Sequence, residues 1–165
     1  MIDLFGRFTV SKAIREISMI EVVLAASKAK LDAALNIRRD RKTYLEFFYK
    51  VSVPSAMVGF PITPIAMSNL FINDAYSAVR KSIKKLRSIA EKAFRKLNLS
   101  FVVYSNVNTK LREVEDRLRS IEALQAEQCV NELMKCIDDL LALCSDMLSA
   151  LRSVTPSIRD EVSGI

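Results

Sequence analysis

The feature that most constrains the fold of this chain is a long alternation of three- and four-residue steps between apolar positions. The first run begins at Val10 and continues to Phe48. This spacing places side chains on one face of an α-helix. It predicts a helix over 9–53, ended by Pro54 because the residue before a proline avoids the helical conformation. The stripe consists of Val10, Ala13, Ile17, Ile20, Leu24, Ser27, Leu31, Ala34, Arg38, Arg41, Leu45 and Phe48.

A second stripe with the same spacing begins at Tyr76, shifts its phase near Gln125 and ends at Ala150. It predicts a basic helix over 69–97, a kink or break within 98–108, and a C-terminal helix over 109–154 that Pro156 stops. We expect these helices to lie in line. The stripe consists of Tyr76, Val79, Ile83, Leu86, Ala90, Ala93, Leu97, Ser100, Tyr104, Val107, Leu111, Val114, Leu118, Ile121, Cys129, Leu133, Cys136, Leu140, Leu143, Met147 and Ala150.

The two stripes predict an all-α protein built from long amphipathic helices, as an antiparallel helical hairpin or bundle. We expect a single domain over 1–165, with an N-terminal arm (1–8), an apolar proline-containing connector (54–68) and a tail (155–165). The second arm is longer than the first. Its unmatched length must either fold back as a bundle or pack on another subunit, because a bare apolar stripe of that length would aggregate.

The charges are unevenly distributed along the chain. Residues 74–97 contain eight Lys or Arg and only two acids, whereas residues 98–165 contain seven Lys or Arg and eleven acids. A surface that serves only solubility usually mixes its signs. The asymmetry therefore suggests an anionic partner or head-to-tail self-association. We interpret the basic helix as a phosphate-contacting surface, with a merely solvated face as the alternative; its cations are Arg80, Lys81, Lys84, Lys85, Arg87, Lys92, Arg95 and Lys96.

A second basic cluster lies in the first helix, at Arg38, Arg39, Arg41 and Lys42. Arg38 and Arg41 occupy stripe positions, and a buried guanidinium group needs a partner. Either the seam opens there toward an anion, or Glu113, Glu115 and Asp116 neutralise it. Glu113–Arg117 and Glu115–Arg119 are also spaced to pair along their own helix. Because the chain has no Trp, base stacking is poorly supported, and the backbone of duplex DNA is the better nucleic-acid partner.

Residues 51–73 carry no charge. The segment is long enough to cross a bilayer, but Pro54, Gly59, Pro61 and Pro64 argue against one spanning helix. We interpret it as a connector packed on its own bundle or on a neighbouring subunit. The alternative is shallow membrane insertion, with an apolar tip formed by Met57, Phe60, Ile62, Ile65 and Met67.

The residue types exclude most catalytic chemistry. The chain has no histidine, and its three glycines are scattered, so histidine-based catalysis and a phosphate-binding glycine loop are excluded. Cys129, Cys136 and Cys144 lie beside Leu133, Leu140 and Met147 of the expected C-terminal helix and are expected to act as small buried hydrophobes. We expect no metal, no cofactor and no enzymatic activity. The opening residues lack the apolar core of a secretory signal, which favours the interior of a cell or a virion.

Three functions fit these features. The first is a self-assembling coat that packages nucleic acid through its basic helix faces without reading sequence, similar in architecture to the helical nucleoprotein coats of filamentous viruses. The second is a membrane-remodelling scaffold: the phenylalanine-containing start MIDLFGRF, followed by charged helices, resembles the layout of ESCRT-III-type proteins. The third is a helical-bundle adaptor that binds other proteins. The expected partners are therefore nucleic acid, copies of the chain itself, and a membrane touched through 51–73.

Overall fold

The computed structural model describes the backbone of residues 8–39 and 64–162, with side chains over 8–39 and 65–154. Within these residues the chain forms four α-helices and one short 3₁₀ helix, with no strand. They are α1 (Val10–Arg39), α4 (Pro64–Lys96), α5 (Phe101–Ser120), η1 (Ile121–Ala123) and α6 (Ala126–Val162). The predicted all-α class is confirmed.

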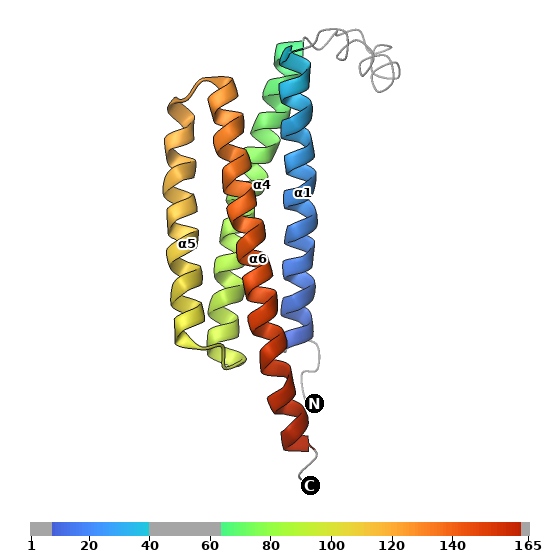
Figure 1. Cartoon of the computed structure of the whole chain (residues 1–165), viewed down its shortest axis with the longest axis vertical. Helices are drawn as coiled ribbons and strands as arrows, with labels where there is room; N and C mark the ends of the chain where they lie inside the picture. Colours follow the sequence, from blue (N-terminus) through green and yellow to red (C-terminus); the bar gives the residue numbers. More distant parts are fainter. Residues whose placement is uncertain (1–7, 40–63, 163–165) are drawn as a thin grey trace, which may run out of the picture.

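The four long helices lie side by side, and each runs opposite to the one before it (Figure 1). α1 packs against α4 and α6, and α5 packs against the same two helices from the other side. The chain after α4 therefore does not continue in line, as the second stripe suggested, but folds back beside α1 and α4. Because this packing occurs within one chain, the unequal arm lengths no longer require a second subunit.

The two predicted stripes form the core. In α1 the stripe is buried from Val10 to Ala34, and Ser27 within it satisfies its hydroxyl by donating to the Val23 carbonyl at 2.8 Å. Most of the second stripe is buried on the three helices that carry it. The exceptions are exposed Ser100 and half-buried Tyr76, Leu97, Tyr104, Cys129 and Ala150. The fully buried large members of this stripe include Ile83, Leu86, Leu111, Ile121, Leu133, Leu140, Leu143 and Met147.

The reversal between α4 and α5 takes only a few residues. Asn98 has a φ of 55°, a left-handed conformation that Asn tolerates better than most residues. Ser100 then caps α5, because its hydroxyl accepts a hydrogen bond from the Val103 amide at 3.3 Å. The helix resumes at Phe101, so the break within 98–108 occupies only the first part of that range.

A second break divides the residues expected to form one helix over 109–154. α5 ends at Ser120, η1 follows, and Leu124 adopts an extended conformation before α6 begins at Ala126. This break falls where the apolar stripe shifts its phase near Gln125. At the other end, the expected stop at Pro156 is wrong, because the backbone of α6 continues to Val162.

The helix bounds differ from expectation around the connector. α4 begins at Pro64 rather than at residue 69, because proline suits the first turn of a helix, where the missing N–H has no partner. Ile65 and Met67, assigned to the connector, thus belong to α4. Arg41, Lys42, Met57, Phe60 and Ile62 lie outside the described residues, as does the rest of 40–63. None of the described helices is long and apolar enough to cross a membrane.

Candidate functional site

The cations of α4, predicted as one surface, lie on two sides of the helix. Arg80 and Lys84 face α5, where they line a depression with Glu115 and Glu122. Lys81, Lys85 and Lys92 face α1, where they line a groove between α1 and α4. The two sides of α4 differ in how many carboxylates lie near the lysine and arginine side chains.

On the α5 side, carboxylates neutralise part of the charge. Arg87 donates from Nη2 to Oε2 of Glu115 at 2.7 Å, and this hydrogen bond lowers the pKa of the Glu115 carboxyl. Arg95 pairs with Glu91 one turn earlier, also at 2.7 Å. Arg87 and Arg95 thus each have a carboxylate partner in their own chain, and their contact with an external anion stays a prediction.

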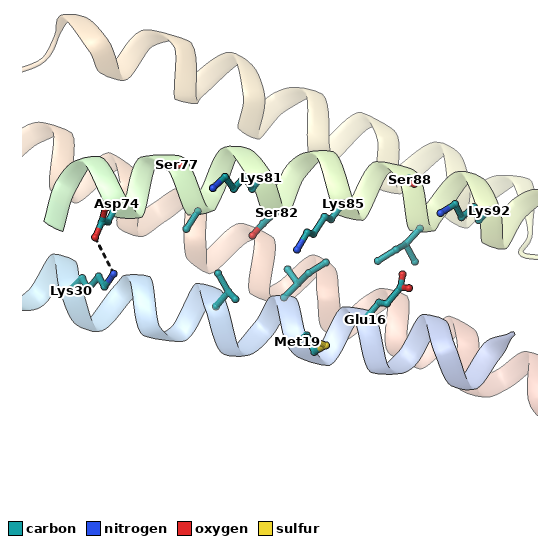
Figure 2. A pocket seen from close by; sticks show the side chains of 14 residues that line it. Glu16, Met19, Lys30, Asp74, Ser77, Lys81, Ser82, Lys85, Ser88 and Lys92 are labelled. Carbon is teal, nitrogen blue, oxygen red and sulfur yellow. Dashed lines mark hydrogen bonds and ion pairs between the residues drawn. The ribbon is translucent and has the colours of Figure 1, made fainter. Parts of the chain in front are cut away.

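On the α1 side, the lysines of α4 have no carboxylate partner among the described residues, and Lys92 lies over the ring of Phe8, with Nζ 5.8 Å from the ring centroid. The groove has a volume of about 760 Å³ and an open side. Lys81, Lys85 and Lys92 line it from α4, and Figure 2 shows the side chain of Lys85 directed toward α1. No carboxylate of the described residues lies within 4.0 Å of Lys81, Lys85 or Lys92. Two acids line the groove. One of them, Asp74, forms an ion pair with Lys30 of α1, with 3.1 Å between Oδ2 and Nζ. Glu16 is the other acid in the lining, so Lys81, Lys85 and Lys92 outnumber the carboxylates left to balance them there.

Three apolar side chains of α1 are exposed on or next to the wall of this groove, two of them in its lining and Val22 beside Val23 in the sequence. Met19 is 63% exposed, Val22 is 69% exposed and Val23 is 45% exposed. Met19 and Val23 line the groove itself. We call the surface formed by Met19, Val22, Val23, Lys81, Lys85 and Lys92 the α1/α4 face. It joins a positive row to an apolar ridge on a neighbouring helix.

The arginines at the end of α1 serve the fold. Arg38 donates from Nε to the Ser68 hydroxyl at 2.6 Å and from Nη2 to the Asn69 side-chain oxygen at 2.8 Å. Ser68 is fully buried and donates in turn to the Ala34 carbonyl at 3.3 Å. Arg38 therefore bonds to neutral groups and not to the expected carboxylates of α5, whereas its contact with an external anion stays a prediction. Arg39 is mostly exposed and lies 4.0 Å from Glu127.

The residues proposed as an apolar tip are only partly placed. Ile65 is 64% exposed and Met67 is half-buried, both in the first turns of α4. They precede the lysines of the α1/α4 face by several helical turns. The structure therefore does not bring them together with the basic row.

The cysteines behave as the stripe predicted. Cys136 and Cys144 are buried and Cys129 is half-buried. Burial raises the pKa of Cys136 to about 11 and that of Cys144 to about 12. All three are unoxidised thiols, and the two buried ones stay protonated at neutral pH, which makes them poor nucleophiles. In the described residues no cluster of His, Cys, Asp and Glu could hold a metal ion.

Comparison with protein-family models, with curated proteins and with solved structures gave no match. The functional interpretation therefore rests on the residues of the chain. The α1/α4 face combines exposure, unpaired charge and apolar surface, and this combination makes it the candidate functional site.

Proposed function

We propose that this protein is a non-enzymatic helical scaffold that lays its α1/α4 face against an anionic membrane surface. The observation that carries the proposal is the position of exposed Met19 and Val23 in the same groove as Lys81, Lys85 and Lys92, which have no ion-pair partner among the described residues. A membrane interface presents phosphate headgroups beside acyl chains. Surfaces that bind it combine cations with an apolar ridge in this way.

The expected strength is that of a reversible peripheral contact. A lysine near an anionic leaflet contributes about 1 kcal/mol, and apolar area removed from water contributes about 25 cal/mol per Å². Three lysines and three half-exposed apolar side chains together supply several kcal/mol before the cost of immobilising the protein. Tight attachment would then require several copies acting together.

A nucleic-acid backbone is the alternative partner for the same lysines. Lys81 and Lys92 are eleven residues apart, which is about 16 Å along a helix and long enough to meet several phosphates. However, a phosphate backbone offers nothing apolar to cover Met19, Val22 and Val23. The apolar ridge therefore favours the membrane.

Self-association remains a prediction that rests on the charge asymmetry. The acidic half of the chain was expected to offer a complementary surface for a neighbouring basic helix. In the structure, Asp138, Asp139 and Asp146 pair instead with Lys28, Arg117 and Lys110 of the same chain. These acids are engaged, so a head-to-tail contact would have to compete with their internal ion pairs.

Co-sedimentation with vesicles tests the proposed function. We expect the protein to bind vesicles that contain phosphatidylserine, to lose that binding as salt is raised, and not to bind phosphatidylcholine vesicles. A titration with duplex DNA under the same conditions is expected to show weaker binding. Tight DNA binding without vesicle binding would replace the membrane proposal by the nucleic-acid alternative.

A further inference from the structure

We infer that the reversal between α4 and α5 is a second membrane contact, an aromatic tip that enters the acyl boundary of the bilayer. The tip consists of Phe94, Arg95, Lys96, Phe101 and Val102. This inference rests on the proposed membrane docking and adds a site that the α1/α4 face does not contain. The tip lies at one end of the bundle, where the chain turns from α4 into α5 (Figure 1).

The apolar side chains of the tip are turned toward solvent. Phe101 is 68% exposed, Val102 is 67% exposed and Phe94 is 37% exposed. Phe101 and Val102 are the first two residues of α5. Adjacent exposed residues of this size at the end of a bundle do not serve the core, which the same turn fills with buried Leu99.

Ring contacts, a helix cap and a buried leucine hold the tip in a defined conformation. The Phe94 ring stacks on Tyr104 with a centroid distance of 4.5 Å, and it lies 6.2 Å from the ring of Phe101. The Ser100 cap fixes the first turn of α5, and Leu99 anchors the turn in the core. The exposed side chains are thereby held in place before any contact, which reduces the ordering cost of insertion.

The charges around the tip match an anionic bilayer. The sequence contains no acid from Lys92 to Arg112. Lys96 is exposed and has no carboxylate of the described residues within 4.0 Å. Arg95 pairs with Glu91, but both side chains are largely exposed, and such surface pairs are weak enough to be exchanged for a headgroup phosphate.

Continuity with the α1/α4 face favours a membrane over a separate protein partner. Lys92 lines the groove of that face, and Lys96 lies one helical turn further toward the tip. The positive row therefore leads from the groove to the aromatic side chains. A bundle that rests on its α1/α4 face and inserts its tip would be held on the bilayer in one orientation.

A single introduced tryptophan tests the inference, because the chain has none of its own. In Val102→Trp, we expect the tryptophan emission to shift to shorter wavelength on phosphatidylserine-containing vesicles. We also expect lipids brominated at shallow acyl positions to quench it. Leu124→Trp is the matched control: Leu124 is 38% exposed and lies in the connection at the opposite end of the bundle (Figure 1). Its emission should not respond.

A second measurement uses the side chains that would insert. Phe101→Ser with Val102→Ser is expected to weaken vesicle binding about tenfold while leaving thermal unfolding nearly unchanged, because both residues are exposed in the folded chain. If the wild-type protein binds vesicles but the tryptophan emission of Val102→Trp stays unquenched, the tip inference is wrong. The proposed docking of the α1/α4 face on the membrane is then not contradicted. If the wild type binds no vesicles, both proposals fail.

Discussion

Charge reversal of Lys81 and Lys85 to glutamate is expected to weaken binding to phosphatidylserine-containing vesicles by about 30-fold or more. Each lysine contributes about 1 kcal/mol near an anionic leaflet, and about 1.4 kcal/mol corresponds to a tenfold change in affinity. Removing two such contributions gives the lower bound, and the new repulsion adds to it. Both lysines are exposed, and neither forms an ion pair with another described residue, so the helix content of the variant should be unchanged.

The matched control reverses Arg80 and Lys84, which lie on the same helix but face α5. This pair changes the net charge by the same amount. Because charges more than about 8 Å from the bilayer are screened at physiological salt, only a small loss of binding is expected. An equal loss in the two double variants would mean that net charge, and not the α1/α4 face, governs binding.

Leu140→Ala is expected to lower the free energy of unfolding by about 2–5 kcal/mol, the usual cost of emptying a closely packed leucine site. Leu140 lies in α6 and is fully buried within one chain. Urea unfolding followed by circular dichroism measures the change. The effect should not depend on protein concentration, since the burial is intramolecular.

Leu70→Ala provides the comparison for the same side-chain deletion. Leu70 lies in α4 and is 50% exposed, so its truncation should cost well under half as much. Similar small losses at Leu140 and Leu70 would show that α6 does not pack on α1 and α5 as described. A loss at Leu140 that varies with concentration would point to burial between subunits.

The core could be predicted from the sequence because helical periodicity is a local signal. Each buried stripe member of α1 from Val10 to Ala34 follows from its spacing alone. The reversals were harder to predict. They use Asn98 and Leu124 rather than glycine or proline, so the chain turns at residues that carry little local signal. The helices were therefore expected in line, although the phase shift near Gln125 marked the second break.

The candidate site could be predicted only in part, because ion pairing depends on which helices become neighbours. Glu115 was expected to pair with Arg119 along α5, and instead it neutralises Arg87 of α4. Arg117 was likewise expected to pair with Glu113, but it binds Asp139 of α6 at 2.6 Å. These contacts between helices decide which cations have a carboxylate partner and which, such as Lys81 and Lys85, have none among the described residues. No spacing rule within one helix reveals them.

The apolar half of the site was missed although the sequence contains a signal for it. Met19, Val22 and Val23 stand at offsets of 0, 3 and 4, which is a second apolar stripe on α1 outside the one that forms the core. A helix that is apolar on two faces buries one and presents the other. Counting stripes separately for each face would have identified this ridge.

Lysine acetylation with and without vesicles tests the central claim most directly, because one experiment measures every lysine of the unmodified sequence. The α1/α4 face predicts that phosphatidylserine-containing vesicles slow the acetylation of Lys81, Lys85 and Lys92. Exposed Lys84 on the other side of α4 and exposed Lys135 on α6 should react at their original rates. Equal protection of all five lysines, or protection of Lys84 while Lys81 and Lys85 remain reactive, would contradict the proposed docking surface.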